Sequence, residues 1–233
     1  EAQLKYDNIF VCGTSIFRIL EQKTKEEFIK KFYKETGLEF NIISQEEENK
    51  YTVEGTTRNV NSKVAVFIGG GGSTEIAIYD NGIKEMCNTK MGVIDVMEQY
   101  PDLGENLATT DVKTVREWVK TKLKVPTQKA DVLILAGGGH MKFAKNSGIR
   151  LEKNILFEDN QEPIMMDINT RKIDTERYYK EISLNEIRSK VNDPEWWYAT
   201  RAMCAMVLEV ADSLDVKYII PTDISMVYGL ANK

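Results

Sequence analysis

Residues 64–79 read Val-Ala-Val-Phe-Ile-Gly-Gly-Gly-Gly-Ser-Thr-Glu-Ile-Ala-Ile-Tyr, two apolar strand-like runs around four glycines. Glycine reaches positive φ freely and lets backbone N–H groups approach a ligand, so such a turn can cradle an anion. A Walker loop would continue with Lys-Ser or Lys-Thr and a helix, whereas Ser73-Thr74-Glu75 opens another strand. Asp80-Asn81-Gly82 then predicts a tight hairpin into a third strand. The stretch predicts a phosphate-type loop in a β-meander over about 63–88; the alternative on this segment alone is an ordinary glycine-rich hairpin.

The composition of the 233-residue chain fits one large or two small domains. Apolar residues make up 42% of the chain and charged residues 29%, enough for a core and a polar surface. The 31 basic and 36 acidic residues give a net charge of −5 with no basic tract, which disfavours nucleic acid and acidic membrane surfaces as partners. No apolar stretch approaches the length of a membrane span.

Cysteine and histidine usage restricts the chemistry further. Cys12, Cys87 and Cys204 are far apart and odd in number, which fits a cytoplasmic protein better than a disulfide framework or a zinc site. The single histidine, His140, argues against a Ser-His-Asp triad and is interpreted as a loop residue rather than a catalyst. Any hydrolytic base is therefore expected to be a carboxylate.

Apolar periodicity predicts an α/β fold around the meander, a mixed sheet with flanking helices. Strands are expected at 8–12, 38–43, 131–135 and 217–220. Helices are expected after residue 15 (with Ile16, Ile19 and Leu20 on one face), at 24–36, at 110–123, from Asp193-Pro194 to about Leu214, and at the C-terminal end. A second glycine loop, Gly137 to Gly139, follows the strand at 131–135. A set of large apolar residues recurs at helical spacing near the end of the chain: Trp196, Trp197, Met203, Met206 and Val207. We interpret them as core or dimer contacts, so a homodimer is one of the expected assemblies.

Four segments together resemble the exopolyphosphatase and guanosine pentaphosphate phosphohydrolase family of the actin-like phosphotransferase superfamily. They are Thr14-Ser15-Ile16-Phe17-Arg18, Ile42-Ile43-Ser44-Gln45-Glu46-Glu47-Glu48, Gly70-Gly71-Gly72-Ser73-Thr74-Glu75 and Lys90-Met91-Gly92. The third matches the family's phosphate loop residue for residue, and the order and spacing of all four fit.

The resemblance implies an actin-like ATPase fold, related to ribonuclease H. It covers nearly the whole chain but not the whole family fold, because family members begin with a further β-meander that carries another phosphate loop. The chain is therefore expected to be N-terminally truncated relative to the family. It would comprise the C-terminal part of a first lobe over residues 1–50 and a second lobe over residues 51–233.

Three positions depart from the family pattern. Ile68 stands where the family has an aspartate expected to help hold a divalent metal. The second glycine loop ends Gly139-His140 instead of Gly-Thr, and Val227 stands where the family has a basic residue near the C-terminus.

The resemblance also assigns roles to individual residues. Glu48 falls on the catalytic glutamate and would orient the attacking water, although an acidic triplet is otherwise read as a solvated turn. Glu75 is the second predicted catalytic residue and would bind Mg²⁺ beside the phosphate, the alternative being an exposed strand residue. The Arg18 guanidinium would donate two hydrogen bonds to phosphate oxygens. The predicted substrate-binding residues are Arg18, Gly70, Gly71, Gly72, Ser73, Thr74, Gly137, Gly138 and Gly139.

These residues predict a Mg²⁺-dependent hydrolase that releases phosphate from polyphosphate or guanosine pentaphosphate. A second hypothesis is a regulatory protein that binds polyphosphate or guanosine phosphates and has lost the chemistry, motivated by Ile68 and Val227. A third is a sugar or acetate kinase relative that shares the superfamily loop, against which the Glu48 segment argues.

Overall fold

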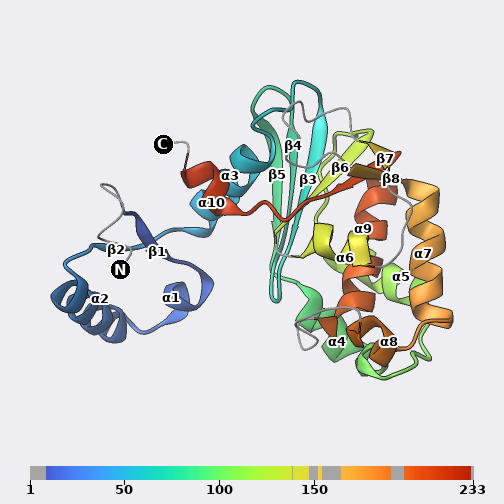
Figure 1. Cartoon of the computed structure of the whole chain (residues 1–233), viewed down its shortest axis with the longest axis horizontal. Coiled ribbons are helices and arrows are strands. Elements are labelled where there is room, and N and C mark those ends of the chain that lie inside the picture. Colours follow the sequence, from blue (N-terminus) through green and yellow to red (C-terminus); the bar gives the residue numbers. More distant parts are fainter. Residues whose placement is uncertain (1–8, 138, 147–151, 154–163, 190–196, 232–233) are drawn as a thin grey trace. The chain divides into compact units, whose positions relative to one another are not determined.

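The computed structural model of the protein describes residues 9–137, 139–146, 152–153, 164–189 and 197–231 (Figure 1). The chain forms two compact units, Glu1–Tyr51 and Thr52–Lys233. The assignment of these units to the end of one actin-like lobe and the whole of a second lobe stays a prediction.

The first unit is a short parallel β-pair with two helices. It contains β1 (Val11–Gly13), α1 (Ser15–Ile19), α2 (Gln22–Thr36), β2 (Phe40–Ile42) and the start of α3 (Gln45–Thr56). Gly37 ends α2 as predicted, because its left-handed φ of 71° lets its N–H donate to the Tyr33 carbonyl. The strand expected at 8–12 begins only at Val11, with residue 8 outside the described residues. The helix expected after residue 15 is confirmed as α1, and its apolar residues Ile16 and Ile19 are 63% and 82% exposed.

The second unit is built on one mixed sheet in the order β5-β4-β3-β6-β9-β8-β7. Its strands are β3 (Val64–Gly69), β4 (Thr74–Tyr79), β5 (Ile83–Thr89), β6 (Val132–Ala136), β7 (Glu152–Lys153), β8 (Ile164–Asp167) and β9 (Tyr218–Pro221). The meander β3–β4–β5 is antiparallel, while β6 runs parallel to both β3 and β9. Asn81 and Gly82 take positive φ in the hairpin, so the predicted meander and its turn are confirmed.

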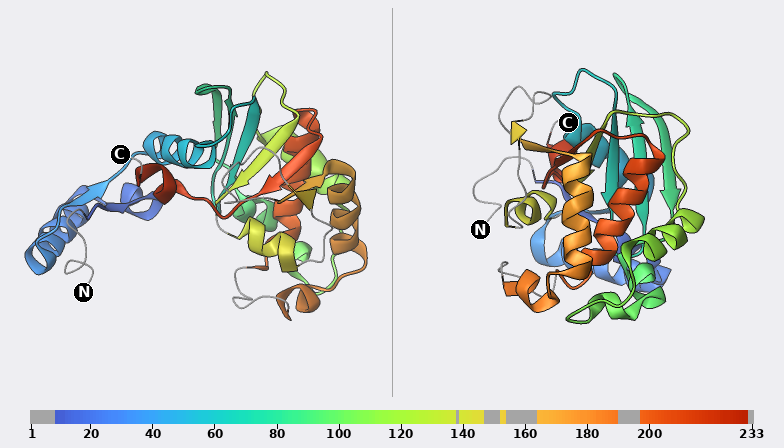
Figure 2. Two further views of the ribbon diagram at one scale, coloured as in Figure 1. Left: turned by 45° about the horizontal axis from the view of Figure 1, so that its top comes forward. Right: turned by 90° about the vertical axis from the view of Figure 1, so that its right-hand side faces the viewer.

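Helices of the second unit gather on one side of this sheet (Figure 2). They are α4 (Val93–Gln99), η2 (Pro101–Gly104, a 3₁₀ turn), α5 (Val112–Lys122), α6 (His140–Asn146), α7 (Ile168–Lys180), α8 (Leu184–Ser189) and α9 (Thr200–Ser213). The helix α10 (Met226–Leu230), near the C-terminus, is not one of them and packs against α3 instead, where a Cβ atom on Gly55 would meet Gly229 and Tyr228. The predicted helix at 110–123 is confirmed as α5. Its N-cap Asp111 accepts a 2.7 Å hydrogen bond from the Thr114 N–H, which fixes where the helix starts.

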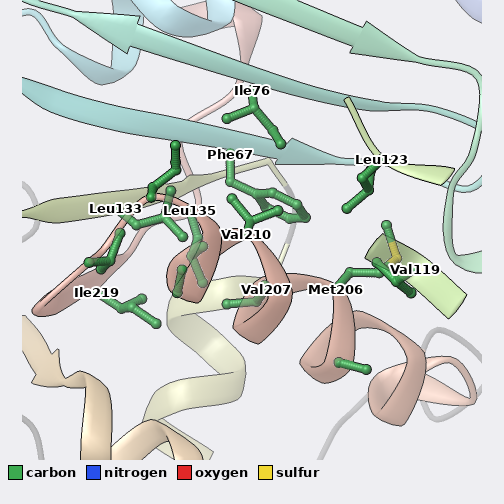
Figure 3. Close-up of a cluster of buried hydrophobic side chains, with 14 of the residues drawn as sticks. Phe67, Ile76, Val119, Leu123, Leu133, Leu135, Met206, Val207, Val210 and Ile219 are labelled. Carbon is green, nitrogen blue, oxygen red and sulfur yellow. The ribbon is translucent and has the colours of Figure 1, made fainter. Parts of the chain in front are cut away.

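The sheet has two distinct faces. We call the face that α5 and α9 cover the helical face; Phe67, Ile76, Val119, Met206 and Val210 meet there in the largest core cluster (Figure 3). Strand side chains alternate between faces, and Val66 and Ala77 point the other way. We call this second face the opposite face; Val53 of α3 packs against it.

Two expectations for the C-terminal half need correction. The predicted start of the helix, at Asp193-Pro194, lies outside the described residues. Residue 197 is in a 3₁₀ helix and residues 198 and 199 form a turn, so α9 begins only at Thr200. Strand β8 was not predicted, because Ile-Met-Met-Asp is short and carries one β-branched residue. Within the described ranges no helix is long and apolar enough to cross a membrane.

Candidate anion site

The β3–β4 connection is a tight loop that projects glycine backbone into solvent. The Gly70 N–H donates to the Ser73 carbonyl at 2.9 Å and closes the turn. Gly71 and Gly72 are exposed at its tip. Thr74 is buried, and its hydroxyl donates to the Met91 carbonyl at 2.7 Å, so that proton is already used inside the protein.

The first residues of α4 fix the orientation of the loop peptides. The Val93 N–H donates to the Gly70 carbonyl at 3.1 Å, and the Ile94 N–H donates to the Gly71 carbonyl at 2.9 Å. In a trans peptide the N–H points opposite to the C=O of the same unit. The N–H groups of Gly71 and Gly72 therefore both point away from α4, as two adjacent donors. Such a pair of backbone N–H groups is the arrangement that binds anions.

Gly92 makes this close approach possible. A Cβ atom on Gly92 would lie 2.3 Å from the Gly71 oxygen and 2.4 Å from the Gly70 oxygen, inside van der Waals contact. Only a glycine lets α4 begin against the loop carbonyls. Gly92 lies in one of the four segments that resemble the family, but no role was predicted for it, because sequence spacing does not reveal its contact with the loop.

Glu75 lies next to the loop and is only 4% exposed, so it is not the exposed strand residue that was its alternative interpretation. It pairs with Ile68 across β3–β4, and cross-strand partners share a face, which places both on the opposite face. Mg²⁺ is commonly held by one or two carboxylates with waters and substrate phosphates. A single buried carboxylate beside an anion loop fits that mode. Among the described residues there is no cluster of three or more His, Cys, Asp or Glu side chains that would form an all-protein cage.

The second glycine loop follows β6 of the same sheet. Gly137 and Gly139 both take left-handed φ values, 99° and 90°, which explains the requirement for glycine at these positions. The Gly137 N–H donates to the Ile224 carbonyl at 2.7 Å, and Asp223 accepts from the Met141 N–H at 3.0 Å at the start of α6. Gly138 lies outside the described residues. Since β3 and β6 are neighbouring parallel strands, the two glycine loops lie side by side at the carboxyl ends of these strands.

The other two predicted site residues, Arg18 and Glu48, meet within the first unit. The Arg18 guanidinium donates to the Glu48 carboxylate at 2.8 Å and to the Ile43 carbonyl at 3.3 Å. Burial, and then the Glu48 carboxylate, raise the pKa of the nearby Cys12 thiol. The structure thus places the predicted base beside the predicted phosphate-binding arginine.

The acidic triplet Glu46–Glu48 forms the first turn of α3, where Glu46 and Glu47 are exposed and Glu48 is partly buried. Ser44 and Glu47 form a capping box: the Glu47 N–H donates to the Ser44 hydroxyl at 3.1 Å, and the Ser44 N–H donates to the Glu47 carboxylate at 2.9 Å. Carboxylates are favoured at a helix N-terminus by the helix dipole. Glu47 is thus a capping residue, which leaves Glu48 as the member of the triplet paired with Arg18.

A model of the Ppx/GppA phosphatase family matches residues 2–153, more than half of the 233-residue chain. The chain belongs to the Ppx/GppA phosphatase family. A curated relative, the bifunctional 3-dehydroquinate synthase/phosphatase of Fusobacterium nucleatum, is 29% identical over 124 residues, which cover 50% of this chain and 18% of that protein. The chain therefore spans less than a fifth of the length of this relative.

Solved Ppx/GppA structures share the fold of the whole chain. The Aquifex aeolicus PPX-GPPA enzyme matches with a TM-score of 0.76 at 17% identity, covering 99% of this chain and 76% of that one. An exopolyphosphatase from Cytophaga hutchinsonii matches with a TM-score of 0.75 at 15% identity, with the same coverage of both chains. The predicted actin-like ATPase fold of this Ppx/GppA protein is confirmed.

Proposed function

We propose that the protein hydrolyses phosphoanhydride bonds and releases phosphate from inorganic polyphosphate or guanosine pentaphosphate with Mg²⁺. The observation that carries this proposal is the β3–β4 loop of a Ppx/GppA family member, which presents the N–H groups of Gly71 and Gly72 together. The names of solved relatives, an exopolyphosphatase among them, support the substrate class. We further propose a cytoplasmic location, in keeping with the accessible free thiols of Cys12 and Cys87.

The residues divide the chemistry between them. The loop N–H groups would neutralise charge on the bound phosphate, and Glu75 would hold Mg²⁺ against it. The metal, when bound, would neutralise charge that develops on the phosphoryl oxygens. Glu48 would accept a proton from the attacking water while its contact with Arg18 fixes its orientation.

The base is tested by Glu48→Gln, assayed as orthophosphate release from polyphosphate. We expect the turnover number to fall about 100-fold or more, because a glutamine cannot accept the proton. The Arg18–Glu48 pair is partly exposed, so the free energy of unfolding should change by only about 0–1 kcal/mol. Glu46→Gln, an exposed position on the same turn, is the matched control. Unchanged turnover in the Glu48 variant would remove Glu48 from the proposal.

A second candidate function is a binding or regulatory protein that retains the loop without turnover. Ile68 favours it, because this aliphatic side chain shares the opposite face with Glu75 where a second carboxylate would otherwise stand. Calorimetry with polyphosphate and with guanosine tetraphosphate, each with and without Mg²⁺, distinguishes the two. Tight metal-independent binding without phosphate release would favour this second function.

A further inference from the structure

A cavity of about 520 Å³ lies on the helical face of the second unit, beside the glycine loop. Its walls are mainly apolar and come from the loop and from α4, α6, α7 and α9. The lining residues are Gly69, Gly70, Gly71, Val93, Ile94, Gly139, His140, Phe143, Arg171, Trp197, Tyr198, Ala199, Thr200, Met203 and Cys204. Trp197 and Met203, interpreted above as core or dimer contacts, thus pack in the core and also face this space. Trp196 lies outside the described residues.

The cavity is on the other side of the sheet from Glu75. A Cβ atom on Gly69 would meet the Phe67 ring and the Met203 methyl group, and Phe67 belongs to the helical face. Glu75 pairs with Ile68 and shares the opposite face with it. The cavity therefore stands apart from the proposed metal position, with only the glycine backbone between them in common.

Arg171 gives this apolar cavity a buried cation. Its side chain is about 4% exposed, and its guanidinium lies over the Phe143 ring at 5.6 Å. It donates to the Cys204 sulfur at 3.2 Å, and its ion pair among the described residues is a long 3.9 Å contact with Asp174, which also faces Arg177. Its Nε is buried and has no hydrogen-bond partner among the described residues.

Among the described residues, the other buried arginine of this unit is Arg201, and its guanidinium has a full set of hydrogen-bond partners. Arg201 is completely buried and donates five hydrogen bonds to the backbone carbonyls of Leu103, Glu105, Asn106, Tyr178 and Ile182, at 2.7–3.1 Å. A buried guanidinium left with unused donors is costly, because water no longer solvates it. Arg171 thus has donor capacity that a ligand in the cavity can use.

Two other titratable groups of the cavity wall, His140 and Cys204, carry no charge at neutral pH. Burial, and then Arg171, lower the pKa of His140 to about 4, so its imidazole is neutral. Burial raises the pKa of the Cys204 thiol, which stays protonated. Arg171 is therefore the charged side chain that faces the cavity among the described lining residues.

We infer that this cavity binds an organic carboxylate with an apolar body. The guanidinium of Arg171 would take the carboxylate, for which its planar donor array is suited. Phe143, Trp197 and Met203 would contact the apolar body. A bare polyphosphate is excluded as the occupant, because its charges would be desolvated against apolar walls with a single cation to compensate. This site goes beyond the proposed phosphate chemistry and does not depend on it.

Calorimetry with three small probes tests the inference on the whole protein. The probes are 3-phenylpropionate, its uncharged analogue 3-phenylpropan-1-ol, and phenyl phosphate. We expect 3-phenylpropionate to bind about tenfold or more tightly than the alcohol, because the alcohol cannot form charged hydrogen bonds with Arg171. Phenyl phosphate should bind more weakly than the carboxylate, since its second charge has no partner in the cavity.

Three variants assign the binding to this cavity. Arg171→Met should weaken 3-phenylpropionate binding about tenfold, whereas Arg177→Met, on the same helix and also facing Asp174, should leave it unchanged. Ile94→Trp, at a 46% exposed position of the cavity wall, should obstruct binding without removing Arg171, which keeps the test valid if Arg171→Met folds poorly. Equal affinity for the carboxylate and the alcohol, preference for phenyl phosphate, or unchanged binding in both Arg171→Met and Ile94→Trp would overturn the inference. Phosphate release is not measured here, so failure of this site and failure of the proposed hydrolase are distinguishable.

Discussion

At the scale of single residues, His140 links burial to pH. Burial lowers its pKa from 6.5 to about 4. Between these two pH values His140 is protonated in the unfolded chain and neutral in the folded protein. Stability supplied by the neutral imidazole is therefore complete above that pH and is lost progressively as the pH falls toward about 4. We expect urea denaturation to show a loss on the order of 3 kcal/mol over this window.

The matched control for this pH dependence is His140→Gln, which removes the titration. Asp102 and Asp111 have pKa values below their ordinary 3.8, because backbone and side-chain hydrogen bonds to their carboxylates outweigh the effect of burial, and their contributions are lost only at more acidic pH. The variant should have a flatter pH profile than the wild type between about pH 6.5 and about pH 4. Parallel profiles for the two proteins would show that His140 is not the source.

Arg201 connects several helical segments of the second unit through hydrogen bonds. Its five hydrogen bonds join backbone carbonyls of η2, the segment after it, α7 and the turn that follows α7. Lysine has three donors on a flexible stem and cannot satisfy these carbonyls. Arg201→Lys should lower the free energy of unfolding by about 3 kcal/mol, measured by urea denaturation. Arg177→Lys, at a half-exposed position, should change it by less than about 0.5 kcal/mol; equal effects would contradict the structural role of Arg201.

At the scale of elements, the glycine loop depends on where α4 begins. Gly92→Ala would place a Cβ atom 2.3 Å from the Gly71 oxygen and must push the loop and helix apart. We expect a loss of about 1–3 kcal/mol in unfolding free energy together with weaker polyphosphate binding, measured by denaturation and calorimetry. Gly72→Ala meets no atom within 4 Å and serves as the stability control. A Gly92 variant as stable as that control would show that the close approach is not required.

The sequence predicted those elements whose pattern of turn residues, caps or apolar spacing is local. The meander, Gly37 and α5 were predictable because turn glycines, caps and apolar spacing act within a few residues. The start of α9 and the short strand β8 were missed, because tertiary packing rather than propensity decides them. The sequence predicted that the loop binds an anion, yet the orientation of its peptides comes from hydrogen bonds with Val93 and Ile94, whose contact only the fold creates.

At the scale of the whole molecule, the sequence predicted single residues of the candidate site but not how the fold brings them together. Arg18 and Glu48 were predicted separately, and the structure shows them paired within the first unit. The cavity around Arg171 carried no sequence signal, because its walls come from five separate segments and its cation lies in the first turn of α7 among ordinary polar residues. An arginine on a helix is normally exposed, so only the burial of Arg171 distinguishes it.

The proposed hydrolase activity is tested most directly by following polyphosphate in the presence of the protein by phosphorus-31 nuclear magnetic resonance. The experiment is run with Mg²⁺, then repeated after chelation of the metal. Hydrolysis transfers the terminal phosphoryl group to water, so we predict a steadily growing orthophosphate signal that stops when the metal is removed. A spectrum in which polyphosphate binds, seen as broadened signals, but no orthophosphate forms would contradict the proposed hydrolase.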